Sequence, residues 1–501
     1  MDSSVALNRN RLVAFLQKPA RDFTINDIKR YIVENGIEMI NFMYPAGDGR
    51  LKTLNFVIND EDYLDSILSQ GERVDGSSLF AHIEPGNSDL YVIPKFHTAF
   101  LDPFAEIPTV TMLCAFFDKD GNRLANSPDY TLEKACSAFR DVTGLTFQAM
   151  GELEYYVIFP ADGTFPAVDQ KGYHESAPFV KTGDFRTRCM SLIAAAGGRI
   201  KYGHSEVGNF TLDGLTYEQN EIEFLPVDGT EAADQLSIAK WVIRRLAEKE
   251  GYNITFAPKI TTGKAGSGLH VHLRLLDGEG HNVMLDSCGN LSNDARTAIA
   301  GMMDMARSIT AFGNTNPTSY FRLVPHQEAP TNICWGDRNR SVLVRVPLGW
   351  NTSDDLCAKA NPGSNAREGS AAGRQTVEIR SADGSADVYY LIAAIAVACR
   401  HGWEMRDPLK VAERTYVDVD IHKPENASRL ALLSHLPASC VESAAALQEQ
   451  RKVYEERGVF SPAYLDAVES RLRGFDDKDL HERAKADLSL MTSLVNRFFH
   501  V

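Results

Sequence analysis

An alternation of polar and apolar residues recurs, in full or in part, in five short segments of the chain, which lie at 152–155, 219–224, 270–275, 340–345 and 376–380. In a β-strand such alternation sends polar side chains to one face and apolar side chains to the other. One such strand on its own usually has a solvated outer face. These five carry Glu, His and Arg on their polar faces and almost no Lys. That choice of residues favours a shared site over five solvated strands.

The remaining pattern predicts an α+β protein with two domains. Residues 1–30 look helical, and 36–57 form two strand-like runs around the turn Pro45-Ala46-Gly47-Asp48-Gly49. Further strands are expected at 90–94 and 109–117, and a helix from near Thr131. The polar turn at 118–122 then separates a small N-terminal domain, 1–122, from a large catalytic domain, 123–501. In the second domain we expect strands, long helices at 229–250 and 292–312, and a mainly helical last 75 residues, with one helix at 463–472.

Composition narrows the class of protein. The chain of 501 residues has 52 Lys and Arg against 67 Asp and Glu, a formal net charge of -15, which argues against nucleic acid as a partner. Its eight cysteines form no C-x-x-C pair, so neither a zinc site nor a disulfide framework is expected. The longest apolar run, 389–399, is too short to span a bilayer and predicts a buried helix. No signal peptide is evident at the N-terminus, and a cytoplasmic location is expected.

The polar faces indicate metal-assisted phosphoryl transfer. Several glutamates with a histidine form a hard ligand set suited to Mg²⁺ or Mn²⁺, because crowded carboxylates repel one another unless cations neutralise them. Arginines bind phosphate or carboxylate through paired hydrogen bonds. A glycine-rich turn at 263–268 leads into His270. It is not a Walker A loop, and alone it would usually be a plain loop.

These motifs occur in an order that resembles glutamine synthetases, over residues 36 to about 450. The resemblance rests on Val74-Asp75-Gly76-Ser77-Ser78, Glu152-Leu153-Glu154, His204-Ser205-Glu206-Val207, Gln219-Asn220-Glu221-Ile222, Phe256-Ala257-Pro258-Lys259, Gly266-Ser267-Gly268-Leu269-His270-Val271-His272, Arg322-Leu323-Val324-Pro325, Glu328-Ala329-Pro330, Asn339-Arg340-Ser341 and Val377-Glu378-Ile379-Arg380. Such agreement between separate motifs identifies the family.

The resemblance implies an N-terminal β-grasp domain and a C-terminal funnel of antiparallel strands with surrounding helices. It also implies a ring-shaped homo-oligomer with active sites between subunits. The implied reaction uses ATP, with two or three Mg²⁺ or Mn²⁺ ions per site, to join ammonia or a primary amine to L-glutamate through γ-glutamyl phosphate.

The resemblance also implies a role for each site residue. One metal would take Glu154, Glu206 and Glu221, and the other Glu152, His270 and Glu378. Gly266, Arg322 and Arg380 would hold glutamate, and His272, Arg340 and Arg345 would face the ATP phosphates. Tyr173 would lie near the amine, and Glu328 on a closing flap. Glu328, Glu206 and Arg340 would be catalytic.

The chain departs from the family pattern where ammonium binds. Tyr44 follows Phe42-Met43 where relatives usually carry an Asp, and Ser205 replaces the second histidine of an H-H-E motif. The stretch between Glu206 and Gln219 is also longer than usual. Three hypotheses follow: a glutamine-forming enzyme, a γ-glutamyl-amide ligase that uses an organic amine, and a catalytically silent relative. We expect Tyr44 at a subunit interface, near the amine pocket of a neighbour.

Overall fold

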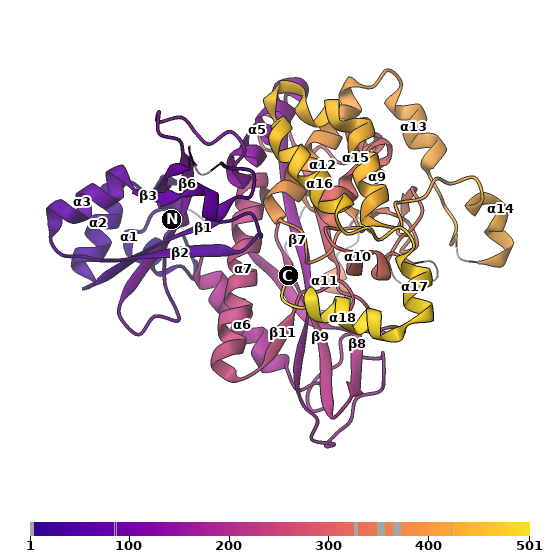
Figure 1. Ribbon diagram of the computed structural model, residues 1–501, viewed down its shortest axis with the longest axis horizontal. Helices are drawn as coiled ribbons and strands as arrows, with labels where there is room; N and C mark the ends of the chain where they lie inside the picture. The colour runs from indigo at the N-terminus through magenta and orange to yellow at the C-terminus, as the bar shows by residue number, and fades with distance from the viewer. Residues whose placement is uncertain are drawn as a thin grey trace.

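The computed structural model describes residues 5–84, 86, 88–324, 329–347, 356–363, 372–421 and 423–501. A small domain with helices on the outside of a sheet lies beside a larger body of strands and helices (Figure 1). The fold is therefore α+β, as predicted. Among the described residues, no helix is both long enough and apolar enough to cross a membrane.

The N-terminal sheet has six strands within the described residues, in the order β2-β1-β6-β4-β3 with β5 on β6. Every pairing is antiparallel except that of β1 with β6. The strands are β1 (Met39–Pro45), β2 (Leu51–Val57), β3 (Glu72–Asp75), β4 (Asp89–Pro94), β5 (Phe100–Leu101) and β6 (Thr109–Phe117). The predicted hairpin and the strands at 90–94 and 109–117 are confirmed. Gly49, at φ +71°, supplies the left-handed residue in the β1–β2 turn.

Short helices cover the outer face of this sheet. They are α1 (Arg11–Leu16), α2 (Ile25–Glu34), α3 (Glu61–Gln70) and α4 (Gly76–Leu79). Thr24 begins α2 with a capping box, in which its side chain accepts from the backbone of Asp27 and Asp27 accepts in return. Ile28 and Ile32 of α2 pack with Ile40 and Phe42 of β1 in one buried cluster.

The catalytic body is built on a second sheet, with nine strands among the described residues. Its path is β13-β14-β15-β12-β7-β9-β8, and β10 and β11 pair with β7. Its strands are β7 (Thr146–Pro160), β8 (Ile200–Leu212), β9 (Leu215–Phe224), β10 (Val227–Asp228), β11 (Asn253–Thr255), β12 (Leu269–Leu276), β13 (Trp335–Asp337), β14 (Val344–Val346) and β15 (Val377–Ile379). Only β13 and β14 of these run parallel. The polar face of this sheet carries the residues discussed below.

Helices surround the second sheet (Figure 1). They are α5 (Pro128–Thr143), α6 (Gly183–Ala195), α7 (Gly229–Glu250), α8 (Asn293–Asp304), α9 (Ala306–Gly313), α10 (Pro317–Arg322), α11 (Leu356–Ala360), α12 (Val388–Glu404), α13 (Pro408–Thr415), α14 (Ala427–Leu430), α15 (Cys440–Glu455), α16 (Pro462–Arg473), α17 (Leu480–Ala486) and α18 (Leu488–Arg497). The helix predicted at 229–250 is α7, the apolar run at 389–399 lies buried in α12, and the mainly helical C-terminal region is confirmed.

Two predicted elements were wrong in extent. The helix expected at 292–312 is broken at Met305, whose backbone leaves helical geometry with ψ 5°; the Ser308 hydroxyl donates to the Met305 carbonyl at this break. The strand expected at 340–345 begins only at Val344. Asn339 Oδ1 accepts from the backbone and hydroxyl of Ser341, which fixes a turn there instead of a strand.

A buried ion pair joins the two domains. Lys95, at the end of β4, donates to both carboxylate oxygens of Asp234 on α7 at 3.0 Å. The Tyr389 hydroxyl of α12 donates to the same carboxylate at 2.7 Å. Burial disfavours the charge on Lys95, but the carboxylates of Asp234 and, to a smaller extent, Asp129 outweigh burial and raise the pKa of Lys95.

We expect Asp234→Asn to destabilise the protein by about 3 kcal/mol, because it removes the main counter-charge of the buried Lys95 ammonium. Urea unfolding checks this value. The double variant Lys95→Met with Asp234→Leu is the control, since it removes both charges and should cost less than the single change. Equal losses in the two variants would mean that packing, and not the unpaired charge, sets the effect.

Tyr44 does not lie where we expected. Its side chain is only 4% exposed and packs edge-on against Phe116, with ring centroids 5.4 Å apart, inside the N-terminal core. Successive side chains of β1 point to opposite faces of the sheet, so Tyr44 lies on the same face as Phe42, and both side chains are buried. The expectation that Tyr44 lines the amine pocket of a neighbouring subunit is therefore wrong.

Tyr44→Asp should consequently act on stability and not on amine preference. Burying a carboxylate in this core should cost about 3 kcal/mol or more. Tyr44→Phe keeps the ring and should fall within ~1 kcal/mol of the parent protein. Thermal and urea unfolding of both variants test this. A Tyr44→Asp protein that keeps full stability would contradict the burial.

Candidate active site

One cavity of about 1390 Å³ opens over the polar face of the second sheet. Every residue assigned a role from the sequence lines this cavity except Glu328, which lies outside the described residues. Those residues are Glu152, Glu154, Tyr173, Glu206, Glu221, Gly266, His270, His272, Arg322, Arg340, Arg345, Glu378 and Arg380. Segments that are far apart in the sequence therefore share one site.

Strand register explains this convergence. Glu154 of β7 lies directly opposite Glu221 of β9, and Glu152 lies opposite His270 of β12. On the other side of β12, Glu378 of β15 lies opposite His272. Side chains directly opposite on antiparallel strands approach within about 5 Å. A shift of one residue would turn them to the other face, so the alternation seen in the sequence is what holds the site together.

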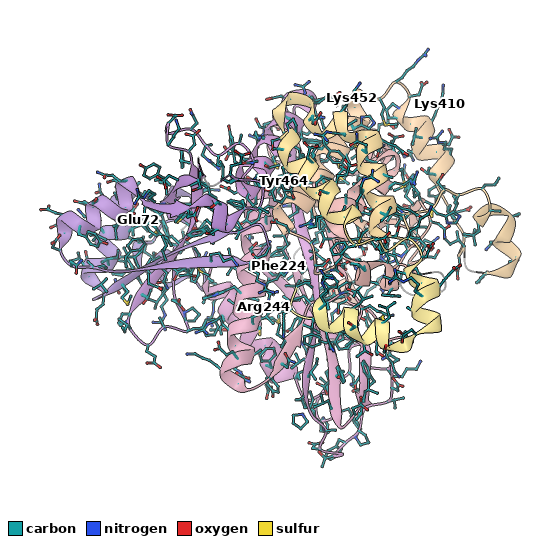
Figure 2. All side chains as sticks on the ribbon, in the orientation of Figure 1. Glu72, Phe224, Arg244, Lys410, Lys452 and Tyr464 are labelled. Carbon is teal, nitrogen blue, oxygen red and sulfur yellow. The ribbon has the colours of Figure 1, made fainter. Side chains whose placement is uncertain are left out.

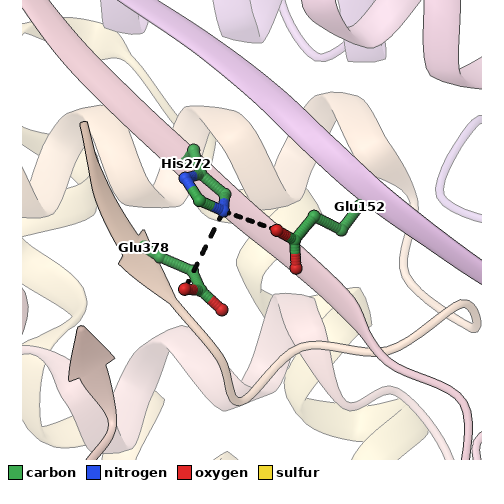
Figure 3. Close-up of side chains that lie close together, drawn as sticks. All are labelled: Glu152, His272 and Glu378. Atoms are coloured by element: carbon green, nitrogen blue, oxygen red, sulfur yellow. Dashed lines mark hydrogen bonds and ion pairs between the residues drawn. The ribbon is translucent and has the colours of Figure 1, made fainter. Parts of the chain in front are cut away.

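The first of two ionisable clusters combines two histidines with two carboxylates. His272 Nε2 lies 2.9 Å from Glu152 Oε1 and 3.9 Å from Glu378 Oε2, and Figure 3 shows its ring between these two side chains. His270 Nδ1 lies 2.9 Å from Glu152 Oε2 and 3.4 Å from Glu378 Oε1. Thr376 Oγ1 lies 2.9 Å from the other nitrogen of His272. Glu152, His272 and Glu378 each offer an atom within 4.8 Å of the others.

The second cluster lies on β8 and β9. Glu206, Glu221 and His204 offer ligand atoms within 4.8 Å of one another, and His204 Nε2 lies 3.6 Å from Glu221 Oε1. Glu154 is adjacent on β7 but already accepts from Gly268 N at 2.7 Å and from Gln219 Nε2 at 3.0 Å. Those donors fix the orientation of Glu154 toward the site.

The charge balance of these clusters fits a divalent cation. Burial raises the pKa of Glu221 well above its usual range, and four nearby carboxylates raise it further. These carboxylates belong to Glu152, Glu154, Glu206 and Glu223. Glu223 Oε2 is also buried without a hydrogen-bond partner in the described structure. Glutamate oxygens with imidazole nitrogens are a donor set that Mg²⁺ and Mn²⁺ accept, and a bound cation would remove the repulsion.

Arginines also line the cavity, next to Glu378 and His270. Arg345 donates to Glu378 Oε2 at 3.1 Å, and its Nε is buried without a partner in the described structure. Arg380 donates to Glu378 Oε1 at 3.1 Å and to the carbonyl of Arg340. The Arg340 side chain itself is exposed to the cavity. Arg322 Nη1 donates to Ser381 O at 2.8 Å, which fixes its guanidinium beside His270. These groups offer donors to an anionic substrate.

The glycine-rich turn brings backbone close to Arg322. A Cβ at Gly266 would meet Pro258 O at 2.5 Å, and one at Gly268 would meet Arg322 Nη2 at 2.6 Å. Gln219 Nε2 donates to Gly266 O at 2.9 Å. Side chains at these two positions would displace Arg322. Only glycine therefore allows the turn to lie this close to the arginine.

Sequence reasoning missed several residues of the cavity wall. His204 lies two residues before Glu206 on β8, and Glu223 lies two after Glu221 on β9. The same i, i+2 spacing that identified Glu152 and Glu154 would have found both. Lys201, which pairs with Glu223 at 2.6 Å, and Tyr202 also line the cavity. No spacing in the sequence indicates these last two residues.

Comparison with known proteins agrees with this geometry. A family model described as the catalytic domain of glutamine synthetase matches residues 125–471, and one described as the glutamine synthetase β-grasp domain matches 36–119. A glutamine synthetase from Staphylococcus epidermidis is 28% identical over 449 residues, which cover 88% of this chain and 92% of the relative. A glutamine synthetase from Thermotoga maritima is 28% identical over 469 residues, 90% of this chain and 96% of that relative.

Solved structures share the fold. A cryo-EM structure of Plasmodium falciparum glutamine synthetase superposes with a TM-score of 0.75 at 18% identity, over 92% of this chain and 97% of that one. A ligand-free structure of a protein named GmaS gives a TM-score of 0.72 at 20% identity, over 91% of this chain and 98% of that one. The N-terminal domain is accordingly a β-grasp domain that precedes a catalytic domain, as predicted.

Proposed function

Because this chain belongs to the glutamine synthetase family and is an ATP-dependent ligase, we propose that it forms glutamine from glutamate, ATP and ammonia. The observation that carries the proposal is the meeting of carboxylate–histidine clusters and arginines in one cavity. Metal-stabilised phosphoryl transfer to a carboxylate requires that combination. We place the boundary between the two domains at residues 122 and 123, in the turn between β6 and α5.

Two divalent ions fit the clusters. Glu154, Glu206 and Glu221 would hold one, with His204 beside them; Glu152, His270 and Glu378 would hold the other, with His272 beside them. When bound, such ions neutralise the carboxylates and offset charge on the transferring phosphoryl group. His272 Nε2 lies 2.9 Å from the metal-ligand candidate Glu152, so the assignment of His272 to the ATP phosphates is part of this proposal.

The reaction proceeds in two displacements. A γ-carboxylate oxygen of glutamate bonds to the γ-phosphorus of ATP while the bond to the ADP oxygen breaks, which gives γ-glutamyl phosphate. Arg340 and Arg345 donate to the phosphoryl oxygens during this step. Gly266, Arg322 and Arg380 hold glutamate. The amine nitrogen then bonds to the γ-carbon, phosphate leaves, and Glu206 or Glu328 accepts the released proton.

An organic amine is the second candidate acceptor, and an aromatic wall beside Glu206 favours it. Tyr173, 47% exposed, stacks on His174 with centroids 4.3 Å apart, and His174 lies 4.4 Å from His204. Aromatic faces attract substituted ammonium groups. The buried position of Tyr44 also means that it supplies no group to hold ammonium.

ADP release with glutamate and a panel of amines tests both candidates. Purified protein is assayed with ammonium, methylamine, ethanolamine and a diamine, each with and without glutamate. We expect glutamate-dependent ADP release with ammonium at the highest kcat/KM. Preference for an amine by more than about 10-fold, lost in Tyr173→Ala, would select the second candidate. No release with any amine would leave the silent relative as the remaining hypothesis.

The proposal includes the assembly that the family resemblance implies. A ring-shaped homo-oligomer would place the β-grasp domain of one subunit against the cavity of the next. Mass photometry at working concentration tests this, and a monomer with full ligase activity would contradict the shared site.

A further inference from the structure

A second cavity, of about 1030 Å³, lies beside the active-site cavity. Its described walls come from α13, β13, the end of β14 and the segment 285–291. The floor is apolar and aromatic: Trp335 is 5% exposed and packs against Tyr416 with ring centroids 4.8 Å apart. Leu291 and Val346 complete this floor. The reaction proposed above uses none of these side chains.

Two arginines of this cavity have no side-chain partner among the described residues. Arg296 of α8 and Arg338, next to β13, both line the walls, and neither guanidinium takes part in a described hydrogen bond or ion pair. Lys410 is a third cation on the rim, at the outer edge of α13 (Figure 2), and it pairs with Asp407 at 3.5 Å. The two carboxylates of the lining are Asp337, which accepts from the Tyr416 hydroxyl at 3.2 Å, and the exposed Glu413. Arg296 and Arg338 are therefore the cations of this lining that pair with no carboxylate among the described residues.

The backbone at Arg338 is unusual for a long side chain. Its φ is +56°, in the left-handed region, which such residues adopt only where surrounding contacts enforce it. The contacts are visible: Arg338 N donates to Val346 O at 2.9 Å, and Asn339 Nδ2 donates to Val419 O at 2.8 Å. They fix the backbone of this turn, from which the exposed Arg338 side chain lines the cavity.

The same turn reaches the active site. Arg338 lines the second cavity, and Arg340, two residues later, lines the active-site cavity. The carbonyl of Arg340 accepts from Arg380 on the active-site side. Pro347 and Gln375 line both cavities. A ligand that pulls on Arg338 therefore acts on the position of Arg340 through two intervening peptide units.

We propose that the second cavity is an effector site for a small planar aromatic carboxylate, whose ring packs on Trp335 and Tyr416 and whose carboxylate binds Arg296 and Arg338. The volume suffices for a ligand of this size. Stacking on the aromatic floor would bind the ring of the ligand, and charge-assisted hydrogen bonds to two arginines would bind its carboxylate. Occupancy draws Arg338 toward the ligand and withdraws Arg340 from the phosphates, so kcat falls. The binding site does not depend on which amine the ligase uses.

Calorimetry with 2-naphthoate tests the site directly, in the presence of saturating ADP and Mg²⁺ to fill the active-site cavity. We expect one 2-naphthoate per chain, with affinity weakened about 10-fold in Arg338→Gln and in Arg296→Gln. The neutral analogue 2-naphthamide should bind at least about 10-fold more weakly than the carboxylate. Arg414→Gln, an exposed change on α13 outside the cavity lining, is the matched control and should bind as the parent does.

The ligase assay tests the coupling. Saturating 2-naphthoate should lower kcat about 5-fold in the parent and leave Arg338→Gln unaffected at the same concentration. No binding at millimolar 2-naphthoate, binding abolished by ADP, or binding indifferent to both arginine variants would overturn the site. Binding that leaves kcat unchanged would overturn the link through the turn. Calorimetry needs no turnover, so failure of the proposed ligase function is distinguishable from failure of the site.

Discussion

Replacing Glu221 by glutamine should weaken divalent-metal binding at least about 10²-fold and yet raise the melting temperature of the metal-free protein. Glu221 is buried among four other carboxylates, so without a cation its charge opposes folding. Glutamine has nearly the same shape and no charge. With metal, the same carboxylate would be a ligand, and even residues that only support ligands typically contribute 10–100-fold to affinity. The two effects therefore have opposite signs.

Melting curves of Glu221→Gln with EDTA and with excess Mn²⁺ measure both effects. Glu218→Gln is the matched control, because Glu218 is a buried glutamate on the same strand that accepts from Lys181 N at 2.9 Å and Thr182 N at 2.8 Å. The control should lose stability in both conditions, since it weakens charge-assisted hydrogen bonds. If Glu221→Gln melts at a lower temperature than the parent in EDTA, other groups of the chain already neutralise the carboxylate charges, and the argument that a metal ion must do so fails.

Arg340→Ala should lower kcat by about 10²–10³-fold and change the KM for glutamate much less. The exposed Arg340 side chain lines the cavity without a partner in the described structure, so its donors are available to the transferring phosphoryl group. An interaction made mainly in the transition state affects kcat and not ground-state binding. Removing it should not disturb the fold.

Arg322→Ala provides the contrast. Arg322 is fixed by Ser381 O and lies beside the glycine-rich turn, where the proposed glutamate would bind in both ground and transition states. We therefore expect a raised glutamate KM with kcat reduced less than in Arg340→Ala. Steady-state kinetics of both variants with ammonium decide the question. The same modest KM effect in both would show that the roles are wrongly assigned.

The sequence predicted the site better than it predicted the segments around it. Each strand with alternating Glu, His or Arg faces the cavity, because period-2 alternation and burial of one face together fix which way a side chain points. The strand predicted at 340–345 was too long. Arg340 and Arg345 both line the cavity, as expected, but Arg340 is brought there by a turn at Asn339 and Ser341 and not by a strand.

Tyr44 illustrates what the sequence did not contain. Its place in a family pattern indicated an interface, whereas its side-chain environment depends on β6, which brings Phe116, 72 residues further along the chain, against it. Likewise, no spacing in the sequence relates Arg338 to Arg296, which line the same cavity only in the folded chain. The period of polar and apolar residues predicts which face of a single helix or strand is buried. It does not predict which elements contact one another, because those contacts depend on the tertiary arrangement.

The ion pair between Lys95 and Asp234 is part of a wider seam, and that seam bears on how the chain is synthesised. Phe100 and Phe104 of the β-grasp domain pack against Trp241 of α7, with ring centroids 6.1 and 5.3 Å apart, and Met43 and Leu113 belong to the same core as the catalytic body. The ribosome completes the β-grasp domain, at residue 122, about a hundred residues before α7 begins at Gly229. At roughly 5–20 residues per second, the inner face of that domain stays bare for on the order of 10 s. A nascent chain paused in this interval presents an apolar sheet face to solvent, and we expect chaperones to bind it during this stretch of translation.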